Sequence, residues 1–199
     1  MTVPRSVVTY EQAVQRALAL VGHRVYELGP SHGEFRDCVG FAWEDVYSMP
    51  RKIPGLNHGL LSALLAAGIP RAQAEAYDRQ LDVEDDVNVN ALMADALSLR
   101  RYVELVTTPF PGALVVAPTI HLAGHPLPFI GHIEVVVGVK RAVEWDAGAP
   151  NYALLDTVGC CGPNGRSPGV VAHTGQYFAK HATDWPLPEM TTRLLRVLP

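Results

Sequence analysis

The stretch Gly131-His-Ile-Glu-Val-Val-Val-Gly138 is the most convincing β-strand in this chain of 199 residues, and it decides the fold class. Branched apolar residues dominate it and glycines bound it, which is typical of a buried strand. Three further short apolar segments, at residues 113–117, 152–158 and 194–198, have the same character. Together they predict an antiparallel sheet in the second half of the chain.

The first half of the chain has helical patterns. Thr9-Tyr-Glu-Gln12 has the form of a capping box, apolar residues recur after it at helical spacing, and Gly22 is placed to end the helix. A second helix is expected after Asp37-Cys-Val-Gly-Phe41 and should end near Pro50. Cys38 would then lie at or near a helix N-terminus.

The middle region, about residues 51–105, also looks helical and carries no recognisable chemistry. A short helix is expected at residues 60–65, closed by Gly68, and another is expected to be capped by Asn90. The acidic stretch at residues 82–86 is expected to be solvated. Helices that precede strands indicate an α+β fold. We expect one domain, residues 1–199, with a helical insertion at about 51–105.

Composition excludes several functional classes. Apolar residues make up 48% of the chain and charged residues 18%, which is ordinary for a folded globular protein. The net charge is −4 and no Lys/Arg cluster could follow a phosphate backbone, so no nucleic-acid partner is expected. The apolar runs are too short for membrane insertion, and no secretory signal is visible. The sequence thus predicts synthesis in the cytoplasm, with delivery by another system if the target lies outside the cell.

Cys38 is the candidate nucleophile among three cysteines, because Cys160 and Cys161 are neighbours in a loop-like stretch. Cysteine catalysis needs a thiolate, which a helix N-terminus and a nearby imidazolium both favour. Gly40 would let a substrate backbone approach closely. The alternative interpretation is that Cys38 is a small buried hydrophobe.

The candidate base is His132, the first residue of the decisive strand, where a side chain can face a groove while its neighbours pack inward. A catalytic imidazole also needs an orienting group. Glu144, one hairpin further along, could accept a hydrogen bond from His132. Asp146, on the same strand face as Glu144, and Asp156, on a later strand, are alternative third residues.

Two motifs resemble a known family, in the right order and with a matching turn between them. Asp37-Cys-Val-Gly-Phe41 resembles the Asp-Cys-Ser-Gly-Phe nucleophile motif of NlpC-type cell-wall peptidases. The strand from Gly131 to Gly138 resembles their Gly-His-Val-Gly-Ile-Tyr-Ile-Gly strand, and Pro111-Gly-Ala-Leu-Val115 resembles the preceding Pro-Gly-Asp-Leu-Val turn. Val39 and Ala113 depart from these motifs.

The resemblance implies a papain-like fold, with N-terminal helices packed on a C-terminal antiparallel sheet. It implies that Cys38 is the nucleophile, His132 the base and Glu144 the third residue. Tyr26, about a dozen residues before the cysteine, and Asp37 would frame the site. No cofactor is implied.

The implied function is peptidoglycan hydrolysis by a cysteine endopeptidase or amidase that cleaves wall stem peptides through a thioester. The absence of a visible signal favours phage lysis or virion delivery, as a free endolysin or a tail-associated lysin that contacts other tail proteins. Two alternatives stay open. One is an amidase or acyltransferase on another substrate, and the other is a structural tail protein that has lost activity.

A zinc site is a weaker interpretation of the histidines. His121, His125, His132 and His173 could be ligands, but the segment around His121 and His125 lacks the glutamate of a zinc-protease helix. Gly124 and Pro126 make a helix there unfavourable. We therefore expect no metal.

Overall fold

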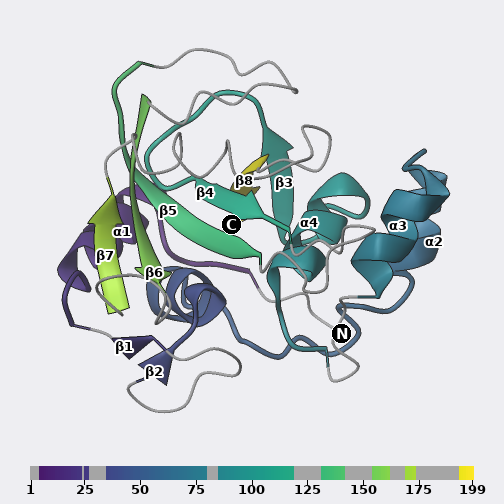
Figure 1. Ribbon diagram of the computed structural model, residues 1–199, viewed down its shortest axis with the longest axis horizontal. Coiled ribbons are helices and arrows are strands. Elements are labelled where there is room, and N and C mark those ends of the chain that lie inside the picture. The colour runs from purple at the N-terminus through teal and green to yellow at the C-terminus, as the bar shows by residue number, and fades with distance from the viewer. Residues whose placement is uncertain are drawn as a thin grey trace, which may run out of the picture.

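The computed structural model describes residues 5–23, 25–26, 35–79, 85–118, 131–141, 154–161, 169–173 and 193–199. These residues form an α+β fold, as predicted, in which helices and a six-stranded antiparallel sheet pack together (Figure 1). The strand order in the sheet is β3-β8-β4-β5-β6-β7. A separate two-stranded parallel sheet joins β1 (Val25–Tyr26) to β2 (Phe35–Arg36).

All four predicted strands are present in the six-stranded sheet. They are β4 (Leu114–Ala117), β5 (His132–Val139), β6 (Leu155–Cys161) and β8 (Arg193–Val197). β6 begins three residues later than predicted and continues into the stretch interpreted as a loop.

Besides β1 and β2, the sequence analysis missed two strands of the six-stranded sheet, both at its edges. They are β3 (Val103–Val106) and β7 (Gly169–His173). β3 is short and interrupted by Glu104, and β7 follows a stretch rich in Gly and Pro. Neither strand therefore shows the run of three valines, at residues 135–137, that marks β5.

Helix α1 (Tyr10–Ala19) begins at the predicted capping box. The Thr9 hydroxyl accepts the backbone N–H of Gln12 at 3.2 Å, and the Gln12 side chain accepts the backbone N–H of Thr9 at 3.0 Å. The second predicted helix is also present, but after two α-helical residues, 38 and 39, it continues as a π-helix, η1 (Gly40–Val46). η1 packs against α1, β5 and β6.

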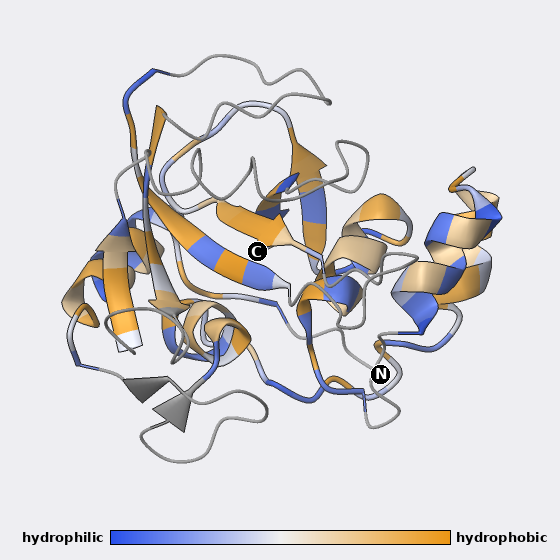
Figure 2. Ribbon diagram, viewed as in Figure 1, coloured by the Kyte–Doolittle hydropathy of each residue, from blue (hydrophilic) through white to orange (hydrophobic). Residues whose placement is uncertain are grey.

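The two faces of the sheet bury different clusters, because successive side chains of a strand point to opposite faces. Ile133 and Val135 of β5 belong to the main core, which also contains Cys38 and the buried residues of η1. Val136 belongs to a smaller cluster with Ala113, Val115, Leu155 and Leu194. Figure 2 shows β5 as a hydrophobic ribbon interrupted by hydrophilic bands. Glu134 is two residues from Val136 and therefore shares the face of the smaller cluster.

The middle region forms three helices: α2 (Leu60–Ala66), α3 (Arg71–Asp78) and α4 (Val89–Leu97). α2 and α3 lie side by side at one end of the molecule, and α4 lies between them and the sheet (Figure 1). The prediction that Asn90 caps α4 was wrong. Asn88 is the N-cap and accepts the backbone N–H of Ala91 at 2.9 Å, whereas Asn90 is buried inside the first turn. No helix in the described ranges is both long and apolar enough to cross a bilayer.

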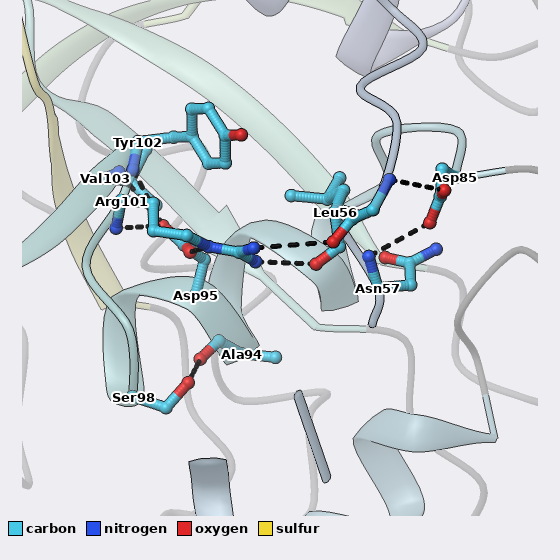
Figure 3. Close-up of polar contacts among 10 residues, drawn as sticks. Leu56, Asn57, Asp85, Ala94, Asp95, Ser98, Arg101, Tyr102 and Val103 are labelled. Atoms are coloured by element: carbon cyan, nitrogen blue, oxygen red, sulfur yellow. Dashed lines mark hydrogen bonds and ion pairs between the residues drawn. The ribbon is translucent and has the colours of Figure 1, made fainter. Parts of the chain in front are cut away.

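Two aspartates hold the chain between Ile53 and Leu56 to the rest of the fold (Figure 3). Asp85 accepts the backbone N–H groups of Gly55 at 2.7 Å and Asn57 at 3.1 Å. Arg101 donates to the carbonyl of Leu56 at 2.6 Å and to the buried carboxylate of Asp95 at 3.0 Å. The expectation of a solvated acidic stretch was wrong for Asp86, which is buried, whereas Asp85 is partly exposed. Both are used in tertiary contacts. Residues 82–84 lie outside the described ranges.

Candidate functional site

Cys38 is the first helical residue of the segment that becomes η1, as its sequence context predicted. Asp37 precedes it and caps this helical start, since its Oδ1 accepts the backbone N–H of Gly40 at 2.6 Å and its carbonyl accepts that of Phe41 at 3.0 Å. The thiol is buried at 8% relative exposure.

Arg51 brings a cation to the same place. Its two terminal nitrogens donate to the two oxygens of Asp37, each at 2.7 Å, in a bidentate pair that is largely shielded from water. Burial lowers the pKa of Arg51, but the hydrogen bond and charge of Asp37, with smaller contributions from Glu44 and Cys38, outweigh burial and raise it. The guanidinium is therefore close enough for its charge to act on Cys38.

His132 is the first residue of β5, and its side chain is partly exposed. Its Nε2 lies 2.9 Å from Oε1 of Glu134, two residues further along the strand. Residues i and i+2 of a strand share a face, so this contact needs no unusual geometry. Glu134 has no exposed surface.

Two more donors surround the Glu134 carboxylate. The Thr157 hydroxyl donates to Oε2 at 2.6 Å, and Nδ1 of His173 lies 3.1 Å from the carboxylate. Burial raises the pKa of Glu134, but hydrogen bonds from His132 and His173 outweigh burial and hold it at about 2. Glu134 is thus ionised at neutral pH and can only accept hydrogen bonds. Nε2 of His132 and Nδ1 of His173 must therefore both carry protons.

Gly159 gives the Glu134 side chain its space. It lies opposite Glu134 in the β5–β6 register, and a Cβ built on it would come within 2.5 Å of Cγ of Glu134. A side chain at position 159 would therefore displace the carboxylate.

The structure does not bring all the predicted site residues together. Cys38 packs in the main core with Ile133 and Val135, whereas Glu134 points to the opposite face of β5. Among the described residues, no hydrogen bond joins the Cys38 thiol to the His132 ring. The cysteine and the histidine–carboxylate group therefore approach β5 from different sides.

Of the candidate third residues, only Asp156 lies within the described residues, and it does not contact His132. Asp156 lies opposite Gly138 and 3.6 Å from Nζ of Lys140. It is about 20 Å along the strands from His132, at 3.3 Å per residue. Glu144 and Asp146 lie outside the described residues. The backbone of Tyr26 lies in β1, and its side chain is outside the description, as are His121 and His125.

Comparison with known proteins adds nothing to this geometry. No protein-family model, curated protein or solved structure matches the chain. The functional argument therefore rests on the residues themselves. No three His, Cys, Asp or Glu side chains within the described segments are grouped to hold a metal ion.

Sequence reasoning missed Glu134, Thr157, Arg51 and the contact made by His173. One signal for Glu134 was available: an acid inside an apolar strand must find partners, and it shares a face with the histidine two positions earlier. Thr157 and His173 come from β6 and β7, and β7 had not been predicted. Arg51 carried no local signal, because its partner Asp37 is 14 positions away in the chain.

A hollow of about 470 Å³ lies three strands away, at the β3–β8 edge of the sheet. Its lining is mostly apolar and hydroxyl side chains, with one cation, Arg196, that is already paired with Glu104 at 2.9 Å. It holds no nucleophile and no acid–base pair. It is therefore a weaker candidate than the histidine–carboxylate group.

Proposed function

We propose that this chain is a cysteine hydrolase that cleaves amide bonds in the stem peptides of bacterial peptidoglycan. Cys38 is the nucleophile, His132 the base, and Glu134 the carboxylate that orients the base. Glu134 takes the role that the sequence analysis assigned to Glu144. The enzyme works without a cofactor and reaches the wall by phage lysis or as part of a virion.

The 2.9 Å contact between Nε2 of His132 and the buried Glu134 carboxylate is the observation that carries the proposal. Because the carboxylate accepts at Nε2, the neutral ring must be an acceptor at Nδ1. A general base needs this tautomer. A carboxylate without exposed surface also stabilises the imidazolium that forms when His132 takes a proton.

The reaction follows from these roles. Nδ1 of His132 takes the Cys38 proton, and the thiolate attacks the amide carbonyl carbon. The backbone N–H of Cys38, at a helix start, is available to the oxyanion. The imidazolium then protonates the leaving amine, so that the C–N bond breaks and a thioester remains. His132 removes a proton from water, which attacks the thioester and releases the acid and the free thiol.

This chemistry requires the thiol to meet His132 at the first residue of β5. Because the thiol packs on the face of β5 opposite to Glu134, the proposed reaction requires the partly exposed His132 ring to reach the thiol around the start of the strand. The substrate class comes from the resemblance of the motifs around Cys38 and His132. Glu134 departs from the family strand that β5 resembles, because that strand has glycine at this position.

A second candidate is a structural protein, such as a phage tail component, that has lost catalytic activity. The observation that favours it is the burial of Cys38 on the opposite face of β5 from Glu134. In such a protein the thiol would keep an ordinary pKa.

The test is hydrolysis of purified peptidoglycan, followed by turbidity and released amines. We compare the parent with Cys38→Ala, with Cys160→Ala as a matched buried cysteine, and with a chelator. The proposal expects loss of at least about 10³-fold in Cys38→Ala and activity close to parent with Cys160→Ala or chelator.

Full activity in Cys38→Ala would refute the cysteine mechanism. If the parent itself is inactive, the rate of Cys38 alkylation against pH decides between the candidates. A thiol pKa well below 8.5 supports the hydrolase, acting on another amide, and an ordinary value supports the structural protein.

A further inference from the structure

Two imidazoles share one buried carboxylate at the end of the sheet. His132 of β5 and His173 of β7 approach Glu134 at 2.9 and 3.1 Å. Thr157, which lies between them on β6 and is aligned with His173 in the strand register, donates the third hydrogen bond. One carboxylate thus receives donors from three adjacent strands. The proposed reaction uses only one of the two imidazoles.

We propose that His173 is a positioning residue, which holds the Glu134 carboxylate toward His132 and thereby sets the orientation and basicity of the catalytic ring. This inference rests on the proposed function and deepens it. His173 itself does not touch the reacting atoms.

The two histidines differ in a way that suits different roles. The side chain of His132 is 24% exposed, whereas that of His173 is 11% exposed. The more exposed ring is the one that a substrate can reach. The more enclosed ring of His173, whose Nδ1 lies 3.1 Å from the carboxylate, is suited to holding Glu134 in place.

His173 also limits the charge available to His132. A carboxylate that accepts from two imidazoles divides its negative charge between them. If the His173 donor is removed, more of that charge acts on His132 and raises its pKa. Among the described residues, the polar side chains that contact Glu134 are His132 on β5, Thr157 on β6 and His173 on β7. Val115 on β4 and Gly159 on β6 lie opposite Glu134 in the strand registers, and Lys140 and Asp156 pair at the other end of β5.

The test compares His173→Leu, which removes the donor and keeps the volume, with His173→Asn, whose amide nitrogen stands where Nδ1 was. The His132 imidazole is followed by NMR against pH in the full chain, and peptidoglycan hydrolysis is measured in parallel. We expect the pKa of His132 to rise by about 0.5 or more in His173→Leu and to stay at the parent value in His173→Asn. In His173→Leu the acid limb of the pH profile of kcat/KM should shift to higher pH together with the pKa of His132. We also expect kcat to fall about tenfold and KM to stay unchanged.

A His132 titration in His173→Leu that matches the parent would overturn the proposal, because His173 would then only pack. If His173→Leu does not fold, as judged by circular dichroism, His173→Gln replaces it. Its longer side chain carries the amide past the Nδ1 position, so the same rise is expected. The NMR titration is independent of hydrolysis. Failure of the cysteine mechanism, seen as full activity in Cys38→Ala, is thus distinguishable from failure of the role given to His173.

Discussion

A buried carboxylate costs several kcal/mol unless donors replace the water that it loses, and Glu134 shows how this chain meets that need. Three side chains donate to it, and two of them are histidines. The residue is therefore both a stability element and the orienting group of the proposed base. Its ionisation links the stability of the fold to pH.

We predict acid destabilisation that depends on Glu134. The pKa of Glu134 is about 2 in the folded chain, against 4.5 for an ordinary glutamate. Because the pKa of Glu134 is lower in the folded chain than in the unfolded chain, its ionised carboxylate stabilises the fold fully above about pH 4.5. This stabilisation is lost as the pH falls to about 2. The loss should be about 3 kcal/mol in the free energy of unfolding.

Denaturant unfolding at several pH values checks this prediction, with Glu134→Gln as the control. The control should show a flatter dependence between pH 4.5 and 2, the two values that bound the titration of Glu134. If the parent and the control lose stability in parallel over that range, other groups are responsible.

Some residues of the candidate site could be predicted from the sequence, and others could not. Cys38 and His132 were predicted because each lies beside a local sequence signal. Cys38 follows a glycine-containing loop, and His132 is at the start of an apolar strand. The contact between His132 and Glu134 is also local. The contacts of Thr157 and His173 depend on strand register across three strands, which no local pattern specifies.

At the scale of the elements, the β5–β6 pair depends on two glycines that face acidic side chains. Gly159 has no space for a Cβ, because Cγ of Glu134 would lie 2.5 Å away. Gly138 faces Asp156, with the nearest side-chain atom at 3.3 Å, and Asp156 is partly exposed. The first contact is against a fixed side chain, and the second is against a side chain that can turn aside.

We therefore predict that Gly159→Ala impairs the site and that Gly138→Ala does not. Gly159→Ala should shift the His132 imidazole signals, lower hydrolysis at least about tenfold, and cost about 1–3 kcal/mol of stability through overpacking. Gly138→Ala should stay within about 1 kcal/mol of the parent and keep its activity. NMR spectra, hydrolysis rates and denaturant unfolding provide the comparison. Equal effects of the two substitutions would contradict the assigned role of Gly159.

Elements with strong periodicity were predicted well. The capping box of α1, the apolar run of β5 and the final strand β8 all carry their signal within a few residues. The edge strands β3 and β7 were missed because their stability comes from pairing with β8 and β6. The π-helical geometry of η1 also has no local signature, since it depends on packing against α1 and the sheet.

The N-terminal helices and the sheet are joined by a few long-range hydrogen bonds. The Tyr47 hydroxyl, at the end of η1, donates to the carbonyl of Gly112 in the turn before β4, and Tyr47 has no exposed surface. Burial raises the pKa of Tyr47, so the hydroxyl keeps its proton. Tyr10 makes a similar link from α1 to the carbonyl of Val197 at 3.0 Å, but its side chain is only partly buried.

We predict that Tyr47→Phe lowers the free energy of unfolding by about 1–3 kcal/mol, because it leaves the Gly112 carbonyl buried without its donor. Tyr10→Phe, the matched control, should cost less than about 1 kcal/mol, since the Tyr10 side chain is only partly buried and water can replace its hydroxyl group. Thermal and denaturant unfolding measure both variants. A larger loss in Tyr10→Phe would mean that the two halves are held together mainly through α1.

The close fit of Glu134 against Gly159 also constrains how this sequence can diverge. The strand that β5 resembles has glycine at the position of Glu134, which leaves room for a side chain on the neighbouring strand. In this chain the arrangement is reversed: the large residue, Glu134, is on β5, and the glycine, Gly159, is on β6. The two positions cannot both carry large residues. In relatives of this chain they should therefore covary, and a substitution at one position should be tolerated only after the other has become small.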